Sequence, residues 1–285
     1  MILVQAFING ILLGGIYLLA TIGLNLVFGV LRIVNLAHGD FVMLGGYVAL
    51  VTVSLVVLPP LALVLIASLV GLGFGALIYF GVVDRIRTAG ETSWIIVTFG
   101  LSASIVGVMR YFFGPTPHVL NLYSGSLMLG PLYFPTARLV AFLTAIFLTA
   151  ALVYLLRRTR VGKAVRALSQ NPDLAFAMGL PVRALLAGAF AIGSALALAA
   201  GALLINVYSI DPEIGHGIVF KSFAIIALAG IGRNGAIAAT ALALGAGESL
   251  LALWVPLSLT NLLAFVALLV VIAVRPARVL VPRGI

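Results

Sequence analysis

The chain contains no cysteine, and only 8% of its 285 residues are charged. Without cysteine it can form no disulfide and offers no thiol nucleophile or thiolate metal site, so redox chemistry is not expected. Soluble domains carry about 25% charged residues, which keep them solvated. The shortage of charge, together with a hydrophobic fraction of 64%, excludes a soluble globule. Most of the protein surface is therefore expected to face lipid.

Acidic residues are scarce even among the charged ones: 7 Asp and Glu accompany 16 Lys and Arg, which gives a net charge of +9. A basic protein can bind nucleic acid. Here, however, the basic residues stand in short segments between apolar runs and do not follow one amphipathic face. Their distribution indicates membrane topology, and we expect the lipid bilayer, not nucleic acid, as a partner.

Long apolar runs predict an all-α, polytopic membrane protein in which residues 1–285 form a single transmembrane domain. Because a bilayer crossing needs about 20 apolar residues, the runs predict about nine helices, within a range of about eight to ten. The run at 218–231 is the weakest, because it is short and contains Lys221, and a re-entrant hairpin is the alternative there. The predicted spans are 3–30, 41–57, 61–83, 93–113, 135–156, 184–206, 218–231, 234–253 and 258–274.

Basic residues gather in three segments, at 84–87, 157–183 and 275–283. Loops rich in Lys and Arg face the cytoplasm, and an even number of predicted spans separates each segment from the next. We therefore expect the N-terminus outside and the C-terminus in the cytoplasm. The first charged residue is Arg32. No basic n-region of a cleaved signal peptide precedes the first span, which is expected to be retained.

Small residues recur at four-residue spacing in several predicted spans. Helices in lipid associate through close approach of their backbones, which such residues allow. Tight packing is the ordinary explanation, and a pore-lining role is the alternative. The residues are Gly10 and Gly14, Gly71 and Gly75, and the series Gly193, Ala197 and Gly201.

A polar segment at 32–40 separates the first two spans and contains Asn35, His38 and Asp40. Polar side chains are costly in lipid and usually face protein or water. One interpretation is a broken helix whose exposed backbone and polar side chains line the translocation path or its gate. The other is helix capping by Asn35, with Asp40 in the first turn, where the helix dipole favours a carboxylate. Both interpretations stay open at this point.

Lys221 and Glu248 are charged residues inside two successive, antiparallel spans. At a rise of about 1.5 Å per residue, both lie at a similar depth below the outer end of their span. An unpaired charge at that depth would be costly, so we predict that the two side chains form a pair. A purely structural role is the preferred interpretation, and a place on the translocation path is the alternative.

No catalytic site or metal site is predicted, and the chain is not expected to be an enzyme. Its three histidines are scattered, and the sequence shows no Ser, His and acid arrangement. The nearest match to a phosphate-binding G-x-x-x-x-G-K-[ST] loop, at 215–222, has Phe220 in place of the second glycine. We therefore expect no cofactor on this chain, and any ATP chemistry must come from a partner.

The longest predicted cytoplasmic segment is the loop at 157–183. Its apolar spacing predicts two short helices separated at Asn171-Pro172, with the proline at a helix start, where it is tolerated. Contact with anionic lipid would explain the basic residues at the start of the loop. It would not explain the apolar residues Leu174, Phe176 and Met178, and we therefore prefer a docking element for a soluble partner.

Four pieces of the sequence stand in a characteristic order. They are Gly23-Leu24 through Gly29 followed by Asn-Leu-Ala-His-Gly-Asp at 35–40; 160–167 with Asn171, Ala175 and Gly179-Leu180; Lys221-Ser222-Phe223 with Gly230-Ile231-Gly232, Gly235-Ala236 and Glu248; and Arg275-Pro276. Together they resemble the permease subunits of bacterial ABC importers for branched-chain amino acids, the LivH type. The resemblance covers nearly the whole chain.

The resemblance implies a multi-pass subunit of the bacterial inner membrane that pairs with a second, related permease. Two cytoplasmic ATPase subunits would drive alternating access, and an extracytoplasmic binding protein would deliver the substrate. Leucine, isoleucine and valine are the leading substrates, although relatives carry urea, short amides or other amino acids. The loop that couples to the ATPases would comprise Arg160, Gly162, Lys163, Arg166, Asn171, Asp173, Ala175, Phe176, Met178, Gly179 and Leu180.

The same resemblance places Asn35, His38, Asp40 and Glu248 at motif positions without assigning them a role. The competing hypothesis is a self-contained, ion-driven secondary transporter whose proton or ion relay would consist of His38, Asp40, Lys221 and Glu248. Such a transporter needs no ATPase. The ATP requirement of uptake therefore distinguishes the two hypotheses.

Overall fold

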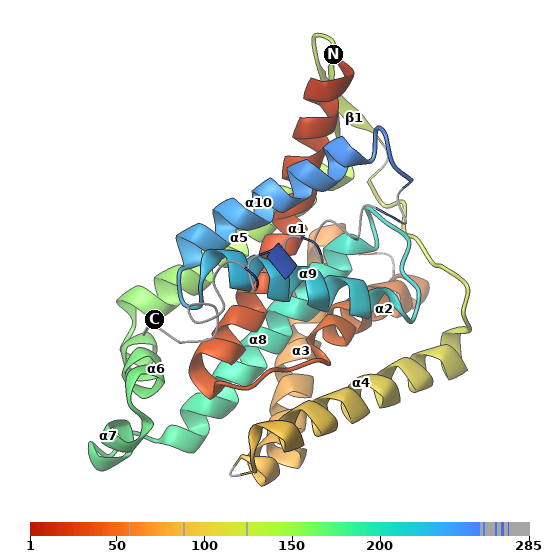
Figure 1. The fold of residues 1–285 in the computed structure, drawn as a ribbon. Coiled ribbons are helices and arrows are strands. Elements are labelled where there is room, and N and C mark those ends of the chain that lie inside the picture. The colour runs from red at the N-terminus through yellow and green to blue at the C-terminus, as the bar shows by residue number, and fades with distance from the viewer. Residues whose placement is uncertain are drawn as a thin grey trace.

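The computed structural model describes residues 1–256 except 57, 88 and 124, together with residues 259, 266, 269, 270 and 273. Within these residues the chain is helical apart from one short hairpin and the connecting segments (Figure 1). The long helices are α1 (Ile2–Leu31), α2 (His38–Leu55), α3 (Pro60–Gly81), α4 (Glu91–Phe113), α5 (Thr136–Arg158), α8 (Val182–Leu204), α9 (Ile214–Ala229) and α10 (Asn234–Leu251). Shorter helices are η1 (Val83–Ile86), α6 (Arg160–Gln170) and α7 (Pro172–Ala177).

Each predicted span from 3–30 to 234–253 corresponds to one of these helices, with ends that differ by a few residues. In the described part of the chain, 6 helices are long and apolar enough to cross a membrane: α1, α2, α3, α4, α5 and α8. The all-α, polytopic prediction is therefore confirmed. The predicted span at 258–274, apart from single positions, and the basic segment at 275–283 lie outside the described residues. The count of about nine spans and the orientation of the termini stay predictions.

The helices α9 and α10 form a pair that packs against α1. Helix α9 has 16 residues, which at about 1.5 Å per residue is shorter than the roughly 30 Å of a bilayer core. The weakest predicted span, at 218–231, is therefore helical but too short to cross a bilayer unaided. Its length suits a helix that lies within the protein and is shielded from lipid by its neighbours.

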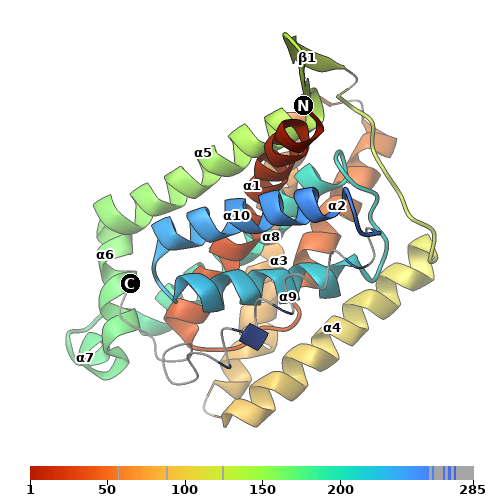
Figure 2. The ribbon, with the colours of Figure 1, turned by 45° about the horizontal axis from the view of Figure 1, so that its top comes forward.

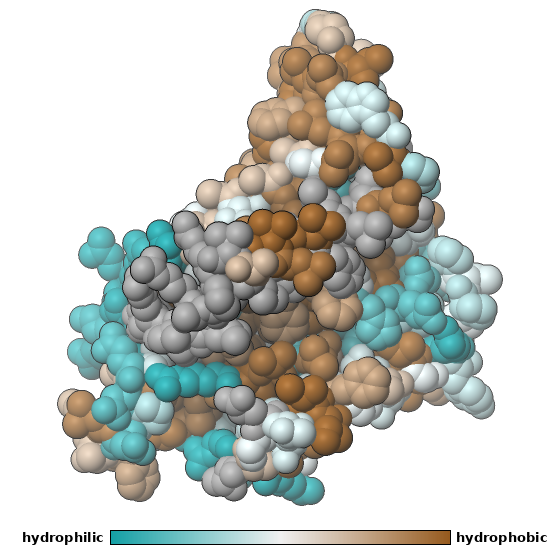
Figure 3. All heavy atoms as spheres, viewed as in Figure 1, coloured by the Kyte–Doolittle hydropathy of each residue, from teal (hydrophilic) through white to brown (hydrophobic). Residues whose placement is uncertain are grey.

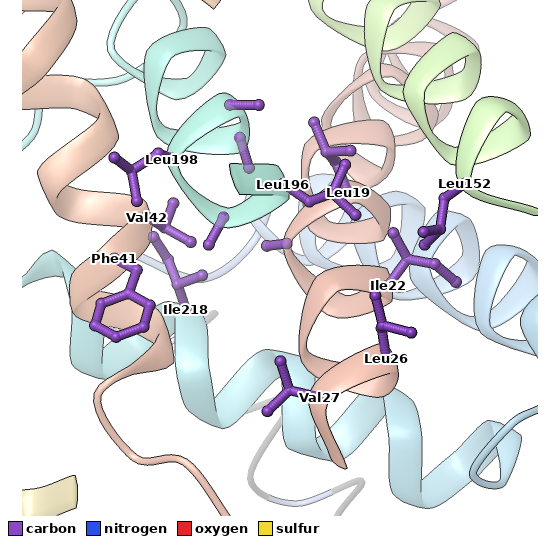
Figure 4. Packing of buried hydrophobic residues seen from close by; sticks show 14 of the residues in the cluster. Leu19, Ile22, Leu26, Val27, Phe41, Val42, Leu152, Leu196, Leu198 and Ile218 are labelled. Carbon is purple, nitrogen blue, oxygen red and sulfur yellow. The ribbon is translucent and has the colours of Figure 1, made fainter. Parts of the chain in front are cut away.

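Helices α1 and α8 form the centre of the bundle, and the other helices pack around them (Figures 1 and 2). A helix that is apolar on all sides belongs in a protein interior or in lipid, and most residues of both central helices are buried. In Figure 4, Leu19 and Ile22 of α1 lie between Leu196 of α8 and Leu152 of α5. This packed centre is the frame on which the polar residues described below are held.

Glycines set the distances between the central helices. A Cβ atom at Gly10 would lie 2.5 Å from the carbonyl oxygen of Gly245, and one at Gly193 would lie 2.8 Å from that of Gly23. Gly201 is more crowded still, because its Cβ would overlap the carbonyl oxygen of Val42. The predicted packing role of the small-residue pairs is confirmed, since Gly10, Gly14, Gly71, Gly75, Gly193 and Gly201 all face the backbone or side chains of another helix.

Two elements lie at the periphery. Helix α4 stands at the edge of the bundle with most of its surface exposed (Figure 2). An antiparallel hairpin of β1 (Ser126–Leu129) and β2 (Leu132–Pro135) turns at Gly130, whose φ is +60°. It lies at the opposite end of the molecule from α7 (Figure 1). The all-α prediction missed this hairpin, because strands of four residues are too short to show a clear alternation.

Candidate functional site

Lys221, Glu248 and Tyr17 form a buried polar cluster where α1, α9 and α10 meet. The Nζ of Lys221 lies 2.6 Å from Oε1 of Glu248 and donates a second hydrogen bond, of 2.9 Å, to the hydroxyl oxygen of Tyr17. That hydroxyl donates in turn to Oε2 of Glu248 at 2.8 Å. The three residues are 6% to 8% exposed. Each charge is therefore matched by an opposite charge and a hydrogen bond, as burial requires.

The predicted contact between Lys221 and Glu248 is thus confirmed, and the equal-depth argument explains why it forms. Tyr17 was not predicted from the sequence. The sequence did contain a signal for it, because Tyr17 lies in the middle of a long apolar helix and a buried tyrosine hydroxyl usually finds a hydrogen-bond partner. This signal could not identify the partner, because Tyr17 lies 204 residues from Lys221 in the chain.

A cavity of about 480 Å³ adjoins this cluster. Its wall includes the cluster itself, the end of α8, the start of α9 and the loop at 205–213 between them. Tyr208 of that loop lies under the guanidinium of Arg138, 5.7 Å from the ring centre. Burial raises the pKa of the Tyr208 phenol, which therefore stays neutral and available for hydrogen bonding. The remaining lining residues are Leu204, Ser209, Asp211, Glu213, Ile214, Gly217 and Ile218.

The segment around Asn35, His38 and Asp40 forms a second buried polar group. Helix α2 begins at His38, whose Nε2 lies 3.0 Å from the carbonyl oxygen of Ala20, near the middle of α1. The chain therefore turns back into the bundle after α1 ends at Leu31. The side-chain oxygen of Asn35 accepts a hydrogen bond of 3.1 Å from the backbone N–H of Ala37. This bond fits the capping interpretation, while the depth of the first turn of α2 fits the broken-helix interpretation.

Asp40 is 1% exposed, and neither carboxylate oxygen has a hydrogen-bond partner among the described residues. It packs directly against Gly215 in the first turn of α9. Ser102 of α4 and His216 of α9 lie close enough to this carboxylate to interact with it. Within the described residues, no ion pair or hydrogen bond joins this group to the Lys221 cluster. The candidate path residues therefore form two separate groups. Helix α9 contributes Lys221 to one group and packs against Asp40 of the other at Gly215.

The predicted pair of short helices in the loop at 157–183 is confirmed as α6 and α7, which we call the α6–α7 corner (residues 160–180). The side chain of Thr159 caps α6 by accepting from the N–H of Gly162 at 3.0 Å. Asn171 caps α7 by accepting from Leu174 at 2.9 Å. Gly179, at φ +76°, follows the end of α7 and lets the backbone N–H of Leu180 donate a hydrogen bond to the carbonyl oxygen of Ala175. The corner is therefore an ordered element.

The residues predicted to couple to ATPases fall into two kinds. Gly162, Asn171, Ala175 and Gly179 shape the corner through close packing and caps. Phe176 and Met178 are instead 74% and 71% exposed. Apolar atoms stand among hydrophilic ones at the α7 tip of the surface (Figure 3). Arg160, Lys163 and Asp173 are charged and exposed, while Arg166 and Leu180 are half-buried.

A hydrogen bond ties the α6–α7 corner to helix α1 of the bundle. A guanidinium nitrogen of Arg32, at the end of α1, donates a hydrogen bond of 3.1 Å to the backbone oxygen of Ser169 in α6. Just after the corner, Arg183 at the start of α8 lies 2.7 Å from a carboxylate oxygen of Asp84, a contact that joins α8 to η1. The corner is thus hydrogen-bonded to α1, which also carries Tyr17, and it leads directly into α8.

The described residues contain no group of three or more His, Asp or Glu side chains able to hold a metal ion. Comparison with known proteins gives the family. The model of the permease component of branched-chain amino acid transport systems matches residues 6–273. The chain belongs to this permease family.

Relatives cover almost all of the chain. It is 27% identical to the high-affinity branched-chain amino acid transport system permease protein LivH of Salmonella typhimurium, over 97% of this chain and 94% of the relative. The LivH protein of Escherichia coli K12 gives the same values. BraD of Pseudomonas aeruginosa is 26% identical over 97% of this chain and 95% of its own length. No solved structure shows a significant match. The chain is therefore a LivH-type permease, as its sequence motifs indicated.

Proposed function

We propose that the chain is the transmembrane permease subunit of an ATP-driven importer that carries leucine, isoleucine and valine across the bacterial inner membrane by alternating access. The observation that carries this proposal is the family match over residues 6–273. The relatives named for branched-chain amino acid transport also align from end to end, over 94% to 95% of their own lengths. The similarity is therefore not confined to one part of the chain.

ATP hydrolysis belongs to other subunits in this proposal. Phe220 stands where a phosphate-binding loop needs its second glycine, and Lys221 is engaged by Glu248 and Tyr17. Two cytoplasmic ATPase subunits would bind ATP and Mg. The partners on the membrane side would be a second, related permease and an extracytoplasmic substrate-binding protein.

The α6–α7 corner is the proposed contact with an ATPase. An exposed apolar patch on an ordered element, rimmed by charged residues, is typical of a protein interface. Phe176 and Met178 supply the patch, while Arg160, Lys163 and Asp173 supply charge around it. The hydrogen bond between Arg32 and Ser169 would pass movement of α6 to α1.

The group at 35–40 is the proposed gate. A helix that begins within the bundle exposes its first N–H groups there, and such broken helices line binding sites in other transporters. Buried Asp40 has no hydrogen-bond partner among the described residues, and it packs on the start of α9. A relative shift of α2 and α9 would therefore change its surroundings at little cost in broken hydrogen bonds.

Uptake by the reconstituted complex tests the proposed function. The chain would be purified in mild detergent from its native membrane, its partners identified, and the complex placed in sealed vesicles with the binding protein. We expect leucine uptake to require ATP and the ATPase subunits. Uptake by this chain alone, driven by an ion gradient, would establish the secondary-transporter hypothesis in its place.

A further inference from the structure

We propose that the cavity beside Tyr17, Lys221 and Glu248 binds the charged head group of a zwitterionic amino acid on its way through the chain. The inference rests on the proposed function and adds a site to it. The cavity volume of about 480 Å³ lies within the range of roughly 300–1,000 Å³ that is typical of small-molecule sites.

The cluster has hydrogen-bonding capacity left for both ends of such a head group. An ammonium carries three donors and a carboxylate accepts at about four positions. Lys221 uses one donor on Glu248 and one on Tyr17, and Glu248 accepts one bond at each oxygen. Lys221 can therefore donate to a substrate carboxylate while Glu248 accepts from a substrate ammonium. The ion pair does not have to break.

The rest of the lining suits the remainder of a branched-chain amino acid. Leu204, Ile214 and Ile218 provide an apolar wall for the aliphatic side chain. The carboxylates of Asp211, Glu213 and Glu248 outnumber Lys221 on the lining, which favours the ammonium end of the substrate. Arg110 outside the cavity pairs with Glu213 and offsets part of this excess.

The cavity lies toward the end of the molecule from which an imported substrate is expected to arrive. Its wall includes the loop at 205–213. Backbone bonds of 2.8 Å between His118 and Ile210, and one of 3.0 Å from Leu120 to Ile205, join this loop to the segment that leads into the hairpin. By the Lys/Arg rule, the hairpin end is the extracytoplasmic one.

Because this chain contains no cysteine, a single cysteine can be introduced into it and labelled in the assembled complex to test the site. A single cysteine at Gly217 would line the cavity, and its Cβ would meet no atom within 4 Å. Gly217→Cys, Ser209→Cys in the cavity and, as a control, Thr116→Cys on an exposed loop would be labelled with a maleimide. The labelling rate would be measured with and without ATP, in the absence of the binding protein.

We expect leucine to slow labelling of the cavity cysteines, but not of Thr116→Cys, in at least one nucleotide state. Leucinamide lacks the carboxylate, and 4-methylpentanoate lacks the ammonium. Each should need a concentration about tenfold or more higher for the same protection, because it loses charge-assisted hydrogen bonds. The substitution Lys221→Met should weaken protection by leucine, while Lys221→Arg should retain more of it.

Absence of protection by leucine in both nucleotide states would overturn the site, and so would equal protection by all three compounds. The labelling experiments with the three compounds use a chain in which Lys221 and Glu248 are intact. They therefore test the site even if a substitution in the cluster prevents folding. Labelling is independent of uptake. A complex that imports leucine without protection refutes the site alone, and a complex that shows protection without ATP-driven uptake refutes the proposed function.

Discussion

Tyr17 and Lys221 lie 204 residues apart in the chain and are joined by a hydrogen bond of 2.9 Å inside the bundle. The bond makes the first long helix a partner of an ion pair that otherwise joins only α9 and α10. Glu248 closes the ring of contacts, since it accepts from both residues. The polar cluster therefore helps to fix the relative positions of α1, α9 and α10.

Removing one charge of this cluster should destabilise the protein. Lys221→Met leaves Glu248 as an unpaired buried carboxylate, at an expected cost of about 3–5 kcal/mol. The double substitution Lys221→Met and Glu248→Leu should cost less than either single change, because no unpaired charge is left. Thermal unfolding in detergent measures all three. If the loss of stability in the double variant equals the sum of the two single losses, the two side chains do not interact.

Exchange of the two charges provides a second measurement of the same contact. Lys221→Glu alone and Glu248→Lys alone each place like charges together, and both should prevent assembly of the complex. The double exchange restores opposite charges at the same depth and should restore part of that assembly. Assembly that stays absent in the double exchange would count against pairing.

Charge on the exposed face of α7 should block ATPase recruitment without affecting membrane insertion. Phe176→Glu and Met178→Glu would each place a carboxylate in the proposed apolar contact, where hot-spot residues contribute about 2 kcal/mol or more. Binding of the ATPases should fall by about thirtyfold or more. The matched controls Phe176→Leu and Met178→Leu keep an apolar surface and should bind. Normal recruitment by both Glu variants would refute the docking contact.

Close packing between α2 and α8 should make Gly201 intolerant of any side chain. Gly201→Ala forces a methyl group against the carbonyl oxygen of Val42, and such overpacking costs about 1–3 kcal/mol or more. Gly73→Ala and Gly188→Ala are suitable controls, because a Cβ at either position meets no atom within 4 Å. Unfolding temperatures should fall for Gly201→Ala and change little for the controls. A tolerated Gly201→Ala would contradict the helix spacing.

The predicted orientation can be checked with single cysteines at the two ends of the molecule. Met128 on the hairpin is 72% exposed, and Gln170 at the end of α6 is exposed as well. A membrane-impermeant maleimide should label Met128→Cys in cells whose inner membrane is intact. It should label Gln170→Cys only after that membrane is permeabilised. The opposite pattern would reverse the orientation derived from the basic segments.

Several features were determined by the sequence alone. The described helices lie at the predicted spans from 3–30 to 234–253, because a lipid environment demands about 20 apolar residues per crossing and this demand acts on one contiguous segment at a time. The break between α6 and α7 is equally local, since Asn171 caps the helix that Pro172 begins. Even the Lys221–Glu248 contact followed from sequence, because two charges at equal depth on adjacent spans have few other means of compensation.

Other features depended on the tertiary structure. The spans are apolar on most sides, so their residue patterns do not say which face meets which neighbour, and small residues permit many close contacts. Only the fold placed Tyr17 on the ion pair, set Asp40 against Gly215 and left a cavity between α8, α9 and their loop. The sequence identified the charges that needed compensation. The packing of α1 and α8 decided which distant residues surround them and where space stays open.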